Sequence, residues 1–176
     1  MRYVWLFIKT LLRLLLKPLS FVPAIVVMYC IIGFSGQDGV DSAQLSYKVT
    51  RKLVVIASDL KNMNLTQDEI AIYTEKYHYH VRKLAHFTEY MILAVTVAFP
   101  LYVYGMRGIW LMIFAGAFCV GFACLDEYRQ SFSIGRSPSK KDVFIDSCGV
   151  FVGIVITRIV GFIGRKTIFA PLAKKR

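Results

Sequence analysis

The chain has 176 residues, of which 56% are hydrophobic and only 19% are charged, and its mean hydropathy is +0.53. A soluble domain of this length carries more charge and less apolar content, so the composition excludes an ordinary water-soluble globular protein. The net charge of +11 is typical of cytoplasmic flanks that contact anionic lipid, and no aromatic-basic module points to nucleic acid.

The first 17 residues form an apolar segment with positive charges at a regular spacing. Lys9, Arg13 and Lys17 recur at every fourth position, which places them on one face of a helix. We therefore predict an interfacial amphipathic helix over residues 1–17. A signal peptide is the alternative, but it fits poorly because the charges run through the apolar stretch and no small-residue cleavage site follows.

A first membrane span is predicted over residues 19–34, and with the preceding segment it reaches the roughly 20 residues that a bilayer requires. Residues 35–82 hold most of the acidic residues and no apolar run long enough to span. They predict amphipathic helices that lie on the outer membrane surface or cap the bundle. Thr66 and Glu69 have the spacing of a capping box, which marks the start of the second of these helices.

Three further spans are predicted over residues 84–104, 109–125 and 143–163. A tight glycine-containing turn joins the first two of them, and a polar loop over residues 126–142 joins the last two. Because only helices and closed barrels can satisfy the backbone inside a bilayer, the sequence predicts a single all-α domain. We expect an integral membrane four-helix bundle with an N-terminal interfacial helix and amphipathic helices in the first outer loop.

Lysine and arginine residues collect in three segments that four spans place on one side of the membrane. These segments are the N-terminal flank, the turn at Arg107 and the basic tail over residues 164–176. Because positively charged loops stay in the cytoplasm, we expect both termini and Arg107 to face it. Arg82 and Lys83 flank the second span on the opposite side and act against this orientation.

Three groups of polar residues lie at the ends of the spans, where ionisable side chains are costly and need a partner or a function. Four spans bring all three groups to the same side of the membrane. The groups are Lys83, His86, Glu89 and Tyr90 at the start of the second span, Asp126, Glu127 and Gln130 at the end of the third, and Arg136, Asp142 and Asp146 before and inside the fourth.

The residue types in these groups predict a site for an anion. Arg136 precedes the start of a helix, and both an arginine and the free N–H groups of a helix N-terminus favour anionic groups. His86 with Glu89, or Asp126 with Glu127, are the candidates for acid–base catalysis. The remaining candidate ligand-binding residues are Lys83, Gln130, Asp142, Asp146 and Tyr90. A structural ion-pair network without a ligand remains the alternative.

Small residues on the last span predict close helix packing. Gly149 and Gly153 follow Asp142 and Asp146 on one helical face, where they let another helix approach closely. The four cysteines have neither C-x-x-C nor metal-ligand spacing, and one histidine with scattered carboxylates is not a zinc pattern. We therefore expect no metal site and no cofactor.

At these residues the chain resembles the VanZ-like family of bacterial membrane proteins. The resemblance covers about residues 82–155 and rests on three short pieces in order, Arg82-Lys-Leu-Ala-His-Phe-Thr-Glu-Tyr90, Asp126-Glu-Tyr-Arg-Gln130, and Gly135-Arg-Ser with Asp142 and Gly149 to Gly153. Asp146 departs from the pattern, where we expect the family to favour Asn. The resemblance implies a multi-span membrane protein linked to resistance to glycopeptide antibiotics, notably teicoplanin, and it implies no reaction.

Three hypotheses about function remain open. The first is a binding or transport protein that recognises an anionic lipid head group, a cell-wall precursor or an amphiphilic antibiotic at the outer face. The second is an integral membrane enzyme that acts on a lipid-linked envelope substrate. The third is a proton-coupled transporter with His86 and Asp146 as a relay, and because four spans are few for a transporter, this hypothesis requires a homodimer. Membrane lipid is the partner that all three share.

Overall fold

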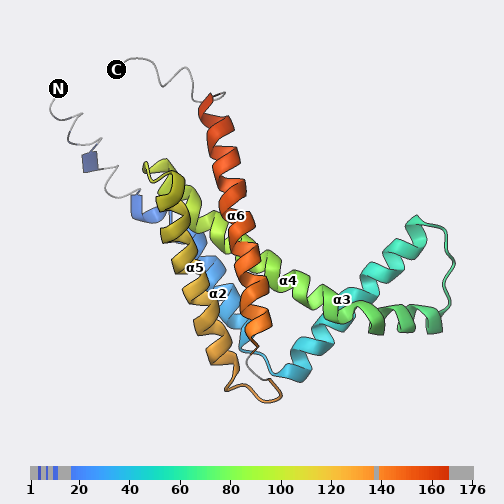
Figure 1. The fold of residues 1–176 in the computed structure, drawn as a ribbon. Helices are drawn as coiled ribbons and strands as arrows, with labels where there is room; N and C mark the ends of the chain where they lie inside the picture. The colour runs from blue at the N-terminus through green and yellow to red at the C-terminus, as the bar shows by residue number, and fades with distance from the viewer. Residues whose placement is uncertain (1–3, 5–6, 8–9, 12–16, 137–138, 167–176) are drawn as a thin grey trace.

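The computed structural model describes residues 4, 7, 10–11, 17–136 and 139–166, and the regular elements of this part of the chain are helices, with no strands (Figure 1). The predicted interfacial helix over residues 1–17 and the basic tail over residues 164–176 lie largely outside the described residues. The main helices are α2 (Val22–Ser35), α3 (Gly39–Leu60), α4 (Gln67–Val103), α5 (Gly108–Gln130) and α6 (Lys140–Lys166).

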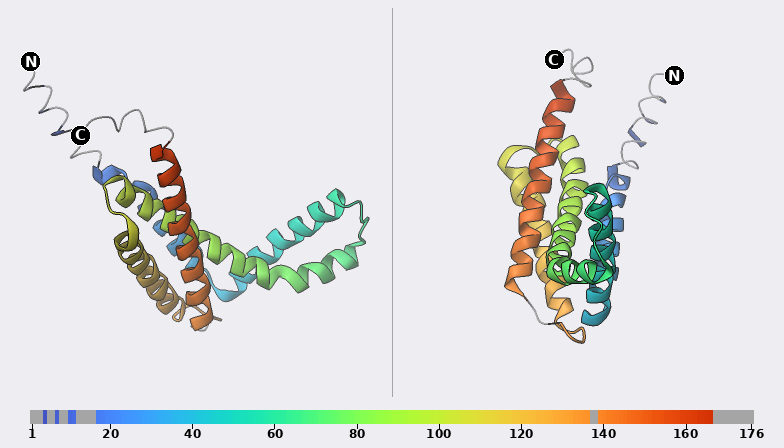
Figure 2. Two further views of the ribbon diagram at one scale, coloured as in Figure 1. Left: turned by 45° about the horizontal axis from the view of Figure 1, so that its top comes forward. Right: turned by 90° about the vertical axis from the view of Figure 1, so that its right-hand side faces the viewer.

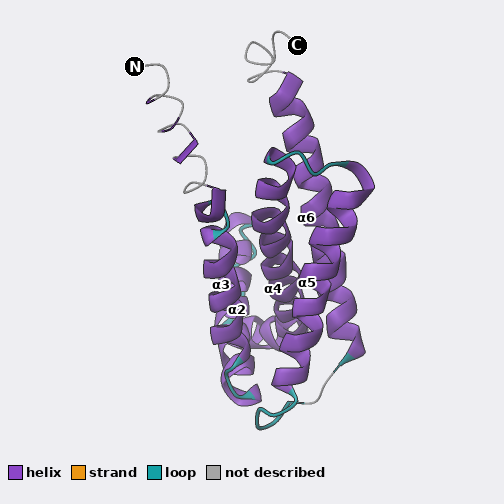
Figure 3. Cartoon of the chain, turned by 90° about the vertical axis from the view of Figure 1, so that its left-hand side faces the viewer, coloured by secondary structure: helices purple, strands orange, loops and turns teal. Residues whose placement is uncertain are grey.

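Four of the described helical segments are long and apolar enough to cross a membrane. They contain most of each predicted span, so the prediction of an all-helical chain with four apolar spans is confirmed. The segments are Lys17–Ser35, Gln67–Val103, Gly108–Gln130 and Lys140–Gly164. Figure 3 shows that a short loop joins α4 to α5.

The longest helix, α4, differs from the prediction in one respect. Residues 67–82 were expected to form an amphipathic helix separate from the span over 84–104, yet Gln67–Val103 is one helix of 37 residues. The capping box at its start is confirmed, because the Thr66 hydroxyl accepts a hydrogen bond from the Glu69 N–H while the Glu69 carboxylate accepts one from the Thr66 N–H. No glycine or proline interrupts α4 before Pro100, and exposed charges do not break a helix.

Helix α3 and the first half of α4 form an antiparallel hairpin that projects from the side of the bundle (Figures 1 and 2). Thr50 and Ser58 of α3 and Ile70 and Thr74 of α4 are buried in this hairpin. The connection between the two helices contains two asparagines with positive φ, which end α3 sharply. The helices that were predicted for residues 35–82 are therefore present, as α3 and the first half of α4.

The core of the bundle lies where α4 meets α5 and α6, and the contact between α4 and α6 is the most extensive. Its buried side chains include Tyr90 and Leu93 from α4, Cys119 from α5 and Ile154 from α6. Large apolar side chains, Phe114, Phe118 and Phe151 among them, stay exposed on the outside of the bundle. Such a surface suits contact with lipid and not with water.

The two ends of the bundle differ in chemistry. At one end, which we call the basic end, the start of α2 contacts the turn between α4 and α5. The Tyr104 hydroxyl donates a hydrogen bond to the Lys17 carbonyl oxygen at 3.0 Å, and the turn uses Gly105 and Gly108 with positive φ, as the sequence predicts. At the other end, the polar end, the last turns of α2 and α5 meet the first turns of α6 and the middle of α4.

Candidate functional site

Asp126 is the centre of a buried hydrogen-bond network at the polar end. Its carboxylate accepts hydrogen bonds from the Ser35 hydroxyl at 2.5 Å and from the Gln130 amide at 2.9 Å. The Arg129 guanidinium lies 3.5 Å from the same carboxylate. Asp126 and Gln130 are four residues apart on α5, so their side chains share a helical face. The network joins the end of α5 to the end of α2 across 91 positions of sequence.

Arg129 binds polar groups at the C-terminal end of α2. Its Nη2 atom donates to the Ile32 carbonyl oxygen and to the Ser35 hydroxyl, both at 2.6 Å. The last carbonyl groups of a helix have no partner inside the helix, and an arginine satisfies them while its positive charge interacts favourably with the helix dipole. Arg129 was not among the predicted site residues, since its partner carbonyl belongs to a distant segment.

Glu127 caps the start of α6 from a different helix. Its carboxylate accepts a hydrogen bond from the Ser139 N–H at 2.6 Å. A negative side chain is favourable at the positive end of a helix dipole. We expected the free N–H groups at this helix start to face an external anion, whereas the protein fills part of this position with its own carboxylate.

A ladder of polar pairs joins α4 to α6. Lys83 forms an ion pair with Asp142, and one turn further the His86 Nδ1 atom lies 4.0 Å from the Asp146 Oδ1 atom. That oxygen of Asp146 is buried and has no hydrogen-bond partner among the described residues. Lys83 and His86 are three residues apart on α4, and Asp142 and Asp146 are four apart on α6, as the sequence shows. The two pairs therefore set the register between these helices.

Next to these polar pairs, the backbones of α4 and α6 pack closely against each other. A Cβ atom on Gly149 would overlap the carbonyl oxygen of Phe87, and one on Gly153 would lie 2.9 Å from the Ala94 Cβ atom and even closer to the Met91 carbonyl oxygen. Real Cβ atoms do not approach other heavy atoms this closely. The two glycines therefore let α6 lie directly on α4 and hold the polar pairs above them in contact.

A small cavity with polar walls opens beside this ladder, between the end of α2, the start of α3 and the middle of α4. It has a volume of about 180 Å³, and we call it the polar cavity. Three predicted site residues line it, His86, Glu89 and Arg136. The other lining residues are Phe34, Ser35, Gln37, Ser42, Leu45, Ser46, Arg82 and Ala85.

The other predicted site residues lie around the polar cavity and not in its wall. Asp126 and Gln130 are one contact away, because Asp126 binds Ser35, which does line the cavity. Lys83, Asp142 and Asp146 occupy the α4–α6 ladder. Tyr90 is fully buried in the core, and its hydroxyl has no hydrogen-bond partner within the described part of the chain. Seven predicted site residues therefore lie outside the cavity wall, namely Lys83, Tyr90, Asp126, Glu127, Gln130, Asp142 and Asp146.

Positive charge dominates the wall of the polar cavity. Arg82 and Arg136 line it together with a single acidic residue, Glu89. The Arg136 Nη1 atom donates to the Ser35 carbonyl oxygen at 3.3 Å, while its Nε atom is buried without a partner among the described residues. Burial lowers the pKa of Arg136, and the nearby charge of Arg82 lowers it further, yet an arginine stays charged in proteins.

Sequence reasoning did not assign several of the polar lining residues to a site, among them Ser35, Arg82, Ser42 and Ser46. Arg82 was interpreted as a flank of the second span and as the first residue of the family motif, and not as a site residue. Ser42 and Ser46 are four residues apart on α3, which is a signal for a shared polar face. That face reaches the cavity only because the Gly39 N–H donates a hydrogen bond to the Ile134 carbonyl oxygen at 3.1 Å, which holds the start of α3 against the α5–α6 connection.

Four apolar spans, a closely packed α4–α6 contact and a polar network at one end define a multi-pass helical membrane protein. A family model described as VanZ/LLP1 matches residues 20–161, and the chain therefore belongs to the VanZ/LLP1 family. The family resemblance noted in the motifs is confirmed. Comparison with curated proteins and with solved structures gives no match. Among the described residues, no group of three histidine, cysteine or acidic side chains could hold a metal ion.

Proposed function

We propose that this VanZ/LLP1 family protein recognises an anionic group in the polar cavity, and that its role is in resistance to glycopeptide antibiotics of the teicoplanin type. The anionic group belongs to a lipid, a cell-wall precursor or the antibiotic. The observation that carries the proposal is the pair of guanidinium groups, Arg82 and Arg136, that line one small cavity. The partly unpaired Arg136 supports it, since the Nε–H group has a hydrogen bond left to donate.

The position of the cavity increases the strength of such recognition. Two unit charges about 4 Å apart interact with about 1 kcal/mol in water and about 4 kcal/mol at an effective dielectric of 20. Arginine also presents parallel N–H donors that match a carboxylate or a phosphate. Asp126 and Arg129 hold Ser35 in place, and the Ser35 carbonyl oxygen positions Arg136. The buried network is therefore assigned a positioning role.

The orientation of the chain is part of the proposal. We infer that the polar end faces the outside of the cell and the basic end faces the cytoplasm, with both termini on the cytoplasmic side. Lys17, Arg107, Arg158 and Lys166 belong to the basic end, and positive residues near span ends favour the cytoplasm. The interfacial helix that the sequence predicts over residues 1–17, and the basic tail, would then be on the side of the inner leaflet.

Cysteine labelling tests this orientation. On a background without the four native cysteines, Gln44→Cys should react with a membrane-impermeant maleimide on intact cells. Arg107→Cys should react only after the membrane is permeabilised. The opposite pattern would reverse the orientation and place the polar cavity on the cytoplasmic side.

Arg136→Lys tests recognition itself. This change keeps the charge and removes the planar pair of donors, so binding of an anionic lipid or of teicoplanin should fall and cells expressing the variant should lose resistance at unchanged membrane levels. Arg51→Lys is the matched control, since Arg51 binds Gln67 on the exposed hairpin and does not line the cavity. Parental binding and resistance in Arg136→Lys, His86→Ala and Arg82→Lys would show that the cavity is structural.

An enzyme is the second candidate function, and the shared position of His86 and Glu89 in the cavity wall favours it. The two residues are three apart on α4, so both can reach one bound group as acid and base. The pair Asp126 and Glu127 is less suited, because Ser35, Gln130 and Ser139 occupy its carboxylates. In an enzyme, Glu89→Gln should abolish turnover of a lipid-linked substrate while binding persists, whereas in a binding protein only the affinity should change.

A transporter that moves protons between His86 and Asp146 has weaker support. The 4.0 Å separation of their side chains is longer than a hydrogen bond, and Asp146, unlike His86, does not line the cavity. A homodimer would be needed to build a pathway from so few spans. Proton-coupled uptake by reconstituted vesicles that His86→Ala removes would support this role against the other two.

A further inference from the structure

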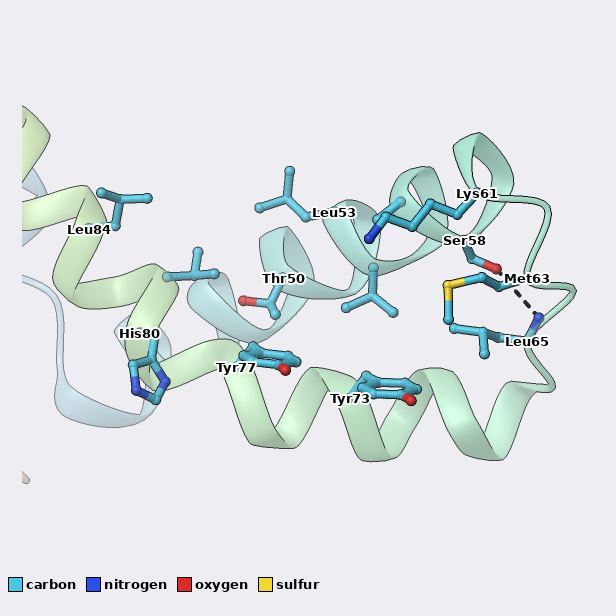
Figure 4. A pocket seen from close by; sticks show the side chains of 13 residues that line it. Thr50, Leu53, Ser58, Lys61, Met63, Leu65, Tyr73, Tyr77, His80 and Leu84 are labelled. Atoms are coloured by element: carbon cyan, nitrogen blue, oxygen red, sulfur yellow. Dashed lines mark hydrogen bonds between the residues drawn. The ribbon is translucent and has the colours of Figure 1, made fainter.

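An apolar groove runs along the hairpin, between α3 and the first half of α4 (Figure 4). Its volume is about 410 Å³. Leu53 and Ala57 line it from α3, and Tyr73 and Tyr77 line it from α4. The two tyrosine rings lie parallel, with an interplanar angle of 5° and centroids 6.5 Å apart, so they form one continuous aromatic wall. A groove of this kind suits a long, flexible apolar group.

The groove and the polar cavity occupy consecutive turns of the same two helices. On α3, Ser46 lines the cavity and Thr50, one turn later, lines the groove. On α4, Ala85 lines the cavity and Val81, one turn earlier, lines the groove. Residues four apart share a helical face, so the groove leads away from the cavity along the hairpin. From Thr50 to Lys61 it extends over about 17 Å at roughly 1.5 Å per residue.

We propose that the groove holds the acyl chain of an anionic bilayer lipid whose head group occupies the polar cavity. This inference rests on the proposed function and names the ligand class. Charge complementarity selects the occupant, because the arginine-lined cavity requires a negative group and the adjoining groove requires an apolar chain. A protein with four spans is surrounded by molecules that combine these two properties.

The exposed surface of the hairpin is consistent with this occupant. Leu53 lines the groove and remains 50% exposed, while Ile56 and Leu60 on the same helix are 54% and 80% exposed. Side chains of this size favour an apolar environment over water. Lys61 lies at the far end of the groove, so it offers a second position for the head group that the experiment must separate from the cavity.

The experiment uses the full chain in detergent micelles and counts bound lipid by native mass spectrometry. Dioleoyl-phosphatidylglycerol is the anionic probe, dioleoyl-phosphatidylcholine the neutral one, and glycerol phosphate a head group without chains. The parent should bind the anionic lipid in preference to the neutral one. Ala57→Phe fills the groove and should weaken binding of the anionic lipid by about tenfold or more, since each displaced methylene changes affinity by roughly fourfold.

Three controls make the result specific. Ala71→Phe places the same bulk on an exposed position of the hairpin outside the groove and should leave binding unchanged. Ala57→Phe should leave glycerol phosphate binding unchanged, because the head group occupies the cavity. Arg136→Lys should weaken binding of both the lipid and glycerol phosphate, whereas Lys61→Gln should weaken neither.

The outcomes separate this inference from the proposed function. If Arg136→Lys weakens glycerol phosphate binding but Ala57→Phe leaves lipid binding unchanged, the groove inference is wrong and the proposed function stands. If Arg136→Lys affects neither probe, the proposed function fails together with the inference. A lipid loss in Lys61→Gln that Arg136→Lys does not share would move the head group to the hairpin tip and overturn the inference. A dimer that only Ala57→Phe dissociates would assign the groove to a second copy of the chain.

Discussion

The α4–α6 contact and the α3–α4 hairpin bury their residues in opposite ways. Between α4 and α6, Gly149 and Gly153 bring two backbones together, and ion pairs above them satisfy the polar groups. In the hairpin, small hydroxyl residues such as Thr50 and Thr74 are buried, while large side chains, Leu53, Ile56 and Tyr77 among them, remain exposed. The first region buries its contact surface between two helices of the same chain. The second leaves apolar side chains exposed around a groove, which is where we propose that an acyl chain binds.

Among the substitutions that test this comparison, Gly153→Leu should lower the stability of the protein most. A side chain at this position meets the α4 backbone, and closely packed helices cannot absorb the volume, so we expect a loss of about 3 kcal/mol or more in stability. The melting temperature in detergent and the folded fraction on size-exclusion chromatography measure it. Gly121→Leu is the control, since a Cβ atom there meets nothing within 4 Å. Equal behaviour of the two variants would contradict the close α4–α6 contact.

Asp126→Ala should destabilise the polar end by about 2 kcal/mol. The change removes the acceptor for Ser35 and Gln130 and leaves their buried donors unsatisfied. Thermal unfolding monitored by circular dichroism measures the loss, and glycerol phosphate binding should also weaken because Ser35 positions Arg136. Asp59→Ala, on the exposed surface of the hairpin, should change neither. A parental melting temperature in Asp126→Ala would show that the hydrogen-bond network of Asp126 does not stabilise the polar end.

Thr66→Ala should have the smallest effect, and the effect should be confined to the hairpin. Loss of the capping box costs about 1 kcal/mol, because the first N–H groups of α4 lose their partner. Hydrogen exchange should increase in residues 67–74 and stay unchanged at the α4–α6 contact. Thr88→Ala, in the same helix but away from its start, is the control. Faster exchange across the whole chain would show that the hairpin and the bundle unfold as one unit.

The local features of the fold were predictable because local sequence determines them. Apolar runs predicted the four spans, and the spacing of Thr66 and Glu69 predicted a helix start. Gly105 and Gly108 predicted the turn between α4 and α5. The continuity of α4 was not recognised, because the charged segment before Leu84 has the composition of a surface loop. Exposed charges decide where a helix lies, whereas glycine and proline decide where it ends.

The polar site was predictable in part. Connectivity alone predicts that His86, Asp126 and Arg136 lie at one end of the bundle, and the structure places them there. It does not predict which of them face a cavity. Arg82, Ser42 and Ser46 reach that cavity only after α3 folds back against α4, and the Ser35–Asp126 contact joins segments 91 positions apart. Such details depend on tertiary packing, which no local pattern contains.

The uninterrupted course of α4 also has a mechanical consequence. Thirty-seven residues make a rod of about 55 Å, nearly twice the thickness of the hydrocarbon layer. Because α4 is one continuous helix, its hairpin half and its membrane span are mechanically connected. Any tilt imposed on Tyr73 and Tyr77 is transmitted along it to His86 and Glu89. A lipid bound in the groove of the hairpin would thereby set the angle at which α4 presents His86 and Glu89 to the polar cavity.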